Sequence, residues 1–215
     1  MSDINVQLAR ECFELNLFQV LPYWRHAQPA SVSALPALAG DAPLLLFVEN
    51  SRPEAVRPVD FLIEPGDVAG LQRAVVEVRA WHADRFYASV IEANPVLGHV
   101  AYEETRQLAR QVFGGREFAT VLVISELPAS PDARDRALRL LRDLDIDHVI
   151  EFPTLLEEVL FKVSAYGQYA PSATLQTLRL LKRYSLIRRL QLEFAFATEP
   201  PPPPAEAQDA LAQRT

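Results

Sequence analysis

The segment from Pro58 to Trp81 constrains the fold most, because it places two strand-like runs on either side of a turn. Residues 59–64 and 73–80 are rich in Val, Ile, Leu and Phe. A Pro-Gly-Asp sequence and a second glycine lie between them. Strand-forming residues that flank turn-forming residues are typical of a β-hairpin, so we expect these two runs to be antiparallel neighbours.

The two faces of this expected hairpin differ in chemistry. Side chains alternate along a strand, and one face has only apolar members: Phe61, Ile63, Ala74, Val76, Val78 and Ala80. If position 64 pairs with position 73, the other face sets Glu64 opposite Arg73 and Asp60 opposite Glu77. Carboxylates about 5 Å apart repel each other unless a cation lies between them. The sequence therefore predicts a divalent metal or a neighbouring arginine beside Asp60 and Glu77.

This pattern resembles the PD-(D/E)xK nuclease superfamily, which has the restriction-endonuclease-like fold. The resemblance implies that Asp60 and Glu77 bind Mg²⁺ or Mn²⁺, and that Arg79 stands where the motif has a lysine. It also implies metal-dependent hydrolysis of DNA phosphodiesters by an endo- or exodeoxyribonuclease. A guanidinium stays charged, so Arg79 can orient or stabilise a phosphate but cannot transfer a proton as a buried lysine can.

Four other side chains are candidates for the same site. Glu49 ends an apolar run and could face the site of Asp60, or it could simply be solvated. His82 and Arg85 follow residues 73–80, where the resembled fold meets its substrate; alternatively they form a capping network for a partly buried loop. His148 could serve as a catalytic base or as a hydrogen-bonded histidine of the sheet.

The remaining pattern predicts one α/β domain over residues 1–195, with a mixed central sheet. Its N-terminal part is a hairpin or meander, and its C-terminal part is αβαβα, an order that the resemblance to the restriction-endonuclease-like fold also implies. The expected strands outside the hairpin are residues 17–24, 43–50, 118–125 and 146–152. The expected helices begin at Ser2, cover residues 100–113, begin at Ser130 and Thr154, and cover residues 171–195.

The C-terminal segment is distinct in charge and composition. On the expected helix 171–195, Arg179, Lys182 and Arg183 share a face at the i, i+3, i+4 spacing. That face is either solvated or contacts phosphates or an acidic protein partner. Residues 196–215 contain five consecutive prolines and are otherwise mostly small or polar, so we expect a disordered tail.

Composition limits the compartment and the partners. The 215 residues are 49% hydrophobic and 23% charged, which is typical of a globular domain. A single cysteine, Cys12, excludes an internal disulfide and a multi-thiolate zinc site, and we expect it to be a small buried hydrophobe. No signal peptide and no long apolar run is evident, so we expect a cytoplasmic protein that does not enter a membrane. The net charge of -7 argues against general coating of nucleic acid but leaves a local basic groove open.

Two hypotheses follow. The first is a divergent metal-dependent DNA nuclease-like domain that uses Asp60, Glu77 and Arg79. The second is a non-catalytic scaffold subunit on the same fold, which binds a protein or nucleic-acid partner through helix 171–195. The acidic net charge and the missing motif lysine favour the scaffold, whereas Asp60 opposite Glu77 favours the enzyme.

Overall fold

The structure of the protein is a computed structural model that describes residues 4–21, 45–80, 82, 85–94 and 97–187. These residues form a mixed α/β fold around a five-stranded sheet with the order β1-β2-β3-β4-β5. The strands are β1 (Phe18–Leu21), β2 (Leu45–Asn50), β3 (Arg73–Arg79), β4 (Ala119–Ile124) and β5 (His148–Glu151). Strands β1, β2 and β3 are antiparallel neighbours, and β3, β4 and β5 run parallel.

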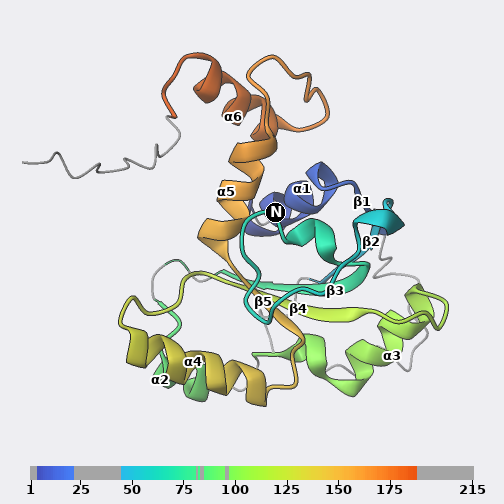
Figure 1. Ribbon diagram of the computed structural model, residues 1–215, viewed down its shortest axis with the longest axis vertical. Helices are drawn as coiled ribbons and strands as arrows, with labels where there is room; N and C mark the ends of the chain where they lie inside the picture. The colour runs from blue at the N-terminus through green and yellow to red at the C-terminus, as the bar shows by residue number, and fades with distance from the viewer. Residues whose placement is uncertain (1–3, 22–44, 81, 83–84, 95–96, 188–215) are drawn as a thin grey trace, which may run out of the picture.

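Helices cover both faces of the sheet (Figure 1). They are α1 (Ile4–Leu15), α2 (Ala88–Ala93), α3 (Glu103–Val112), α4 (Pro131–Asp143), α5 (Phe152–Lys162) and α6 (Ala173–Arg183). Short 3-10 turns occupy Pro53–Ala55, Val68–Gly70 and His99–Ala101. Helices α3 and α4 lie in the crossovers that join the parallel strands, as the expected αβαβα order requires.

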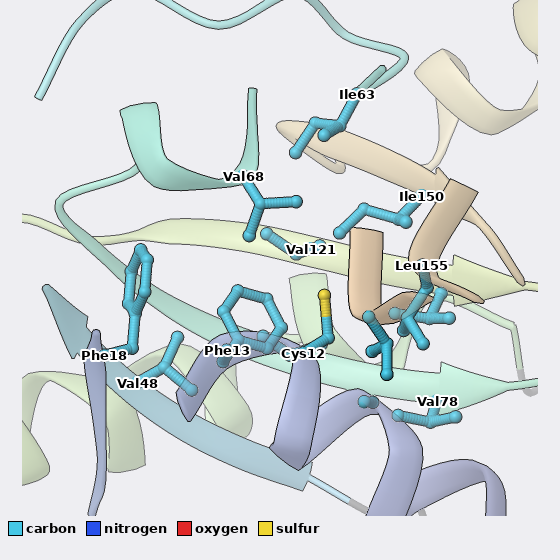
Figure 2. Packing of buried hydrophobic residues seen from close by; sticks show 14 of the residues in the cluster. Cys12, Phe13, Phe18, Val48, Ile63, Val68, Val78, Val121, Ile150 and Leu155 are labelled. Atoms are coloured by element: carbon cyan, nitrogen blue, oxygen red, sulfur yellow. The ribbon is translucent and has the colours of Figure 1, made fainter. Parts of the chain in front are cut away.

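Each face of the sheet packs into its own hydrophobic core. On one face, α1 and α5 bury Cys12, Phe13 and Leu155 against the sheet, where β3 contributes Val76 and Val78 (Figure 2). Burial raises the pKa of the Cys12 thiol to about 12, so this side chain is a packed hydrophobe, as expected, and not a nucleophile.

The second core lies on the opposite face, beneath α2, α3 and α4. It contains Val75, Leu122 and Val149 from the three parallel strands. The sequence predicts that this face of β3 carries polar groups at the surface, but Val75 and Glu77 are fully buried. That expectation is wrong because the crossover helices cover this face.

The expected hairpin is also wrong. Strand β3 pairs with β2, not with residues 59–64. Residues 61–63 lie instead beside β5, where the Ile63 amide donates to the Val149 carbonyl at 2.9 Å and the Val149 amide donates to the Phe61 carbonyl at 2.7 Å. Residues 61–63 run parallel to β5, and β5 and β4 run parallel to β3, so the residues between 63 and β3 form a crossover and not a hairpin turn.

The C-terminal helix begins where the sequence predicts and ends earlier. Ser172 is the N-cap of α6, and its Oγ accepts the Leu175 amide hydrogen at 3.0 Å. The helix ends at Arg183, because Ser185 adopts a left-handed φ of 57°. The remainder of the expected helix and the proline-rich segment 196–215 lie outside the described residues from 188 onward.

Candidate functional site

The predicted catalytic pair Glu77 and Arg79 is buried in the second core. Glu77 is 0% exposed and Arg79 is 5% exposed. In the sheet, Glu77 lies between Leu45 of β2 and Leu122 of β4. A lone carboxylate in such surroundings is costly, so it needs a cation and hydrogen-bond donors at close range.

The protein supplies both to Glu77. Arg79 Nε donates to Glu77 Oε1 at 2.7 Å, and the Val100 amide donates to Glu77 Oε2 at 2.8 Å. His99 lies in the same region, and burial is the main reason that its pKa is lowered, while the charge of Glu77 opposes this shift. Both carboxylate oxygens are thus occupied by groups of the chain itself.

Asp60 lies far from this pair. It is exposed, and its carbonyl oxygen is 2.9 Å from His148 Nδ1. The neighbouring residues 61–63 lie beside β5, so β4 and β5 separate them from Glu77 on β3. Three strand spacings of about 4.8 Å correspond to about 14 Å.

The predicted metal site therefore does not form from Asp60 and Glu77. A Mg²⁺ ion binds oxygen ligands at about 2.1 Å, which a separation of this size does not allow. Across the part of the chain that the structure describes, no group of three or more His, Cys, Asp or Glu side chains is arranged to hold a metal ion. His148 meets the backbone of Asp60 and has the role of a hydrogen-bonded sheet histidine.

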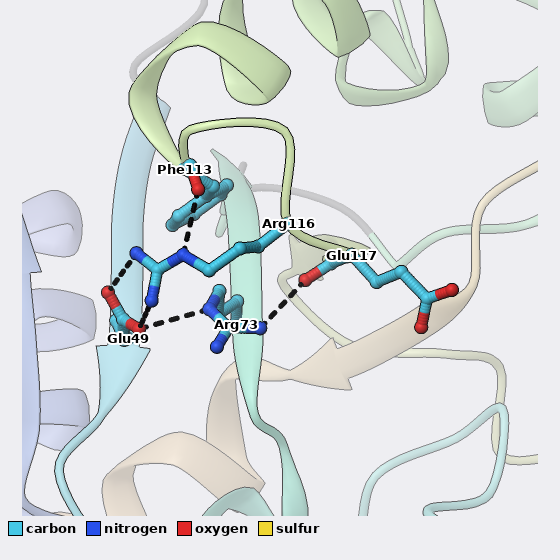
Figure 3. Close-up of polar contacts among 5 residues, drawn as sticks. All are labelled: Glu49, Arg73, Phe113, Arg116 and Glu117. Carbon is cyan, nitrogen blue, oxygen red and sulfur yellow. Dashed lines mark hydrogen bonds and ion pairs between the residues drawn. The ribbon is translucent and has the colours of Figure 1, made fainter.

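Glu49 belongs to a separate ionic cluster where β2 ends and β3 begins (Figure 3). Its Oε1 accepts from Arg73 Nε at 3.0 Å and also from Arg116 Nη1, and its Oε2 accepts from Arg116 Nη2 at 2.9 Å. Arg116 also donates to the Phe113 carbonyl and Arg73 donates to the Glu117 carbonyl. These hydrogen bonds, with that of Arg116 the strongest, lower the pKa of Glu49.

This cluster joins strand β2 to the segment after α3 and is a structural contact. The expected Glu64–Arg73 pair is replaced by Glu49–Arg73, because β2 and not residues 59–64 is the neighbour of β3. Glu49 does not meet Asp60.

His82 and Arg85 line a surface pocket of about 400 Å³ at the carboxyl ends of β4 and β5. Arg85 Nε pairs with Glu126 at 3.0 Å, and His82 Nε2 lies 3.0 Å from Asn5 Oδ1. The His82 ring also packs edge-on against Phe152, with 4.6 Å between the ring centroids. These contacts match the capping network that the sequence offers as the alternative, and the pocket includes neither Asp60 nor Glu77.

The three basic residues of α6 have different environments. Lys182 Nζ donates to the carbonyls of Leu160 and Val163 at the C-terminal end of α5. Arg183 lies 4.7 Å over the ring of Tyr166, and Arg179 Nε donates to Gln176 on its own helix. Lys182 therefore links α6 to α5, whereas Arg179 and Arg183 keep their charge at the surface of the helix.

Exposed large hydrophobic side chains also occur along the segment from the end of α5 to the residues just after α6. Ten such side chains occur among the described residues, and five of them fall between residues 161 and 186, with exposed fractions from 44% to 80%. We call these five residues the C-terminal surface: Phe161, Tyr166, Leu180, Tyr184 and Leu186. Exposed apolar side chains that cluster in this way are typical of interaction sites.

An excess of basic residues marks this region in the sequence, and the sequence-based prediction above names only three of them: Arg179, Lys182 and Arg183. Residues 159–192 contain six Lys and Arg and no Asp or Glu, although the whole chain has 21 basic and 28 acidic residues. The remainder of the chain is thus strongly acidic. The exposure of Leu180 and Tyr184 was not predictable, because on a helical pattern they are equally suited to a buried face.

Comparison of the chain with protein-family models, curated proteins and solved structures finds no match. Among the described helices, none combines the length and the apolar character that crossing a membrane requires.

Proposed function

We propose that this protein is a non-catalytic scaffold that binds a protein partner through its C-terminal surface. The single observation that carries the proposal is the set of exposed Phe, Tyr and Leu side chains on the end of α5, on α6 and in the segments directly after these two helices. Tyr and Arg are the residue types enriched at the energetic centres of protein interfaces, and this surface offers both. The element order, with one helix, three antiparallel strands and then alternating helices and parallel strands, supports a restriction-endonuclease-like scaffold.

The position of α6 suits such a role. Figure 1 shows α5 leading away from the sheet to α6, which lies at one end of the molecule. Helix α6 buries only Leu175 completely among its own residues. It is nevertheless held in place, because Ser172 donates to Glu11 of α1 and Lys182 donates to α5. A fixed helix loses little conformational freedom when a partner binds.

The nuclease hypothesis has less support. Glu77 is paired with Arg79 and accepts a hydrogen bond from the Val100 amide, and Asp60 lies on the far side of β5. A catalytic carboxylate pair must converge on one metal ion or one water molecule. These two do not converge, so the scaffold is the better account of the buried ion pair.

The proposal is tested by site-specific photo-crosslinking of the full chain in its native cells. Tyr184, which is 71% exposed, is replaced by p-benzoylphenylalanine. The matched control is Tyr87, which is 46% exposed and is the N-cap of α2, a helix at the opposite end of the molecule from α6 (Figure 1). We expect a crosslink to a different protein at position 184 and none at position 87. No adduct at position 184, or an adduct only with a second copy of the same chain, would contradict the proposal.

A further inference from the structure

We propose that the partner presents an acidic amphipathic helix to α6; this inference rests on the proposed function and specifies the chemistry of its partner. Leu180 and the C-cap residue Tyr184 lie one helical turn apart, and Arg179 and Arg183 form a second row, turned by about 100° around the helix axis. Each row has a spacing of about 6 Å along the helix axis, from four residues at 1.5 Å. The surface is therefore an apolar row with a parallel row of positive charge.

A helix fits these rows better than an extended strand does. An extended peptide binds mainly by adding main-chain hydrogen bonds to an open sheet edge. Helix α6 has no such edge, because its backbone groups bond within the helix. A partner helix with apolar residues at i and i+4 matches Leu180 and Tyr184, and acidic residues beside them at the same spacing meet Arg179 and Arg183.

The charge distribution favours carboxylates over phosphate polymers and lipid headgroups. Guanidinium groups bind both carboxylates and phosphates in a bidentate geometry, and Arg183 is already oriented by its contact with the Tyr166 ring, so the charge of the surrounding surface decides between the two. Outside residues 159–192 the chain has 15 basic and 28 acidic residues. A nucleic-acid duplex or an anionic bilayer would extend beyond α6 over this acidic remainder and be repelled, whereas one short helix contacts α6 alone.

The test uses two designed peptides of about 15 residues, or four helical turns. Both carry Leu at i and i+4, one with Glu and the other with Lys at the adjoining positions. Fluorescence anisotropy with the full chain should show that the Glu peptide binds about tenfold or more tightly than the Lys peptide. The double change Arg179→Glu/Arg183→Glu should invert this preference. The double change Arg136→Glu/Arg139→Glu, on exposed arginines of α4, should leave it unaltered.

Other outcomes overturn the inference. Equal binding of the two peptides, binding of neither, or a preference that survives the reversal of Arg179 and Arg183 would each do so. Tighter binding of a labelled DNA duplex or of vesicles containing phosphatidylserine would also do so. If these failures occur while the crosslink from position 184 still captures a protein, only the acidic-helix chemistry is wrong and the proposed function stands.

Discussion

The Glu77–Arg79 pair and the arginines of α6 place the same kind of group in opposite settings. Arg79 is 5% exposed and holds a carboxylate within the core. Arg183 is exposed and lies over an aromatic ring at one end of the molecule. The charged motif Glu77–Arg79 on β3 thus stabilises the core. The basic residues Arg179 and Arg183 at helical spacing are the charged groups that a partner can contact.

Removal of the buried carboxylate gives the largest expected effect. Glu77→Gln leaves Arg79 buried without its counter-charge, and we expect a loss of about 3 kcal/mol in the free energy of unfolding, measured by urea denaturation. The exposed Glu64→Gln is the matched control and should change stability by less than about 0.5 kcal/mol. The double change Glu77→Leu/Arg79→Met should recover much of the loss. A Glu77→Gln variant that is more stable than the parent, with a parent that Mg²⁺ stabilises, would restore the metal-site hypothesis.

The Glu49 cluster should show a smaller effect that depends on pH. The pKa of Glu49 is lowered in the folded protein, so its contribution is complete above the ordinary carboxyl pKa and is lost as the pH falls through the folded value. We expect Glu49→Gln to cost about 1 kcal/mol at pH 7, because Arg116 is half exposed. The stability difference between parent and variant should shrink below about pH 4.5. A difference that stays constant between pH 7 and pH 3 would contradict this account.

Lys182 separates the structural part of α6 from its exposed part. Lys182→Met removes the ammonium group that donates hydrogen bonds to the carbonyls of Leu160 and Val163. We expect the free energy of unfolding to fall by about 1 kcal/mol. Hydrogen exchange should accelerate more in the last turn of α6 than in β3 or β4. Arg179→Met is the control, since its contact is with Gln176 on the same helix, and exchange in α6 should then stay near that of the parent. Equal acceleration in both variants would show that Lys182 does not hold the helix.

The smallest expected effect on stability comes from the C-terminal surface. Leu180→Ser/Tyr184→Ser changes exposed side chains, so the free energy of unfolding should stay within about 0.5 kcal/mol of the parent. Circular dichroism and urea denaturation check this. A larger loss would mean that Leu180 and Tyr184 pack within the protein. They would then stabilise the fold as Glu77 does, and would not form an accessible surface.

Much of the fold followed from local patterns. The apolar spacing from Ile4 to Leu15 predicted α1, and Ser130 before Pro131 marked the start of α4 correctly. The helix predicted at residues 100–113 is present as α3, and Gly114 and Gly115 after it both adopt positive φ. The parallel pairing of β3, β4 and β5 followed from the alternation of strands and helices.

The errors came from contacts between distant segments. Residues 59–64 and β3 have the apolar pattern of a hairpin, but β2 is the neighbour of β3. No local pattern shows whether β3 pairs with residues 59–64 or with β2. The expected position of Asp60 beside Glu77 depended on the pairing with residues 59–64. Likewise, Thr154 and Glu157 match a capping box, but α5 already begins at Phe152. Asn favours the left-handed conformation more than Leu does, but the left-handed residue after α1 is Leu17, and the Asn16 side chain donates to the Cys12 carbonyl.

One binding comparison tests the central claim most directly. The protein that crosslinks at position 184 is purified. Its affinity is then measured for the parent chain, for the variant Leu180→Ser/Tyr184→Ser and for Asp60→Asn, which changes an exposed residue of the predicted metal site. We expect the double variant to bind at least about 100-fold more weakly, since two interface anchors are lost at roughly 1.5 kcal/mol each. Asp60→Asn should bind as the parent does. Unchanged binding by the double variant, together with a loss in Asp60→Asn, would contradict the account.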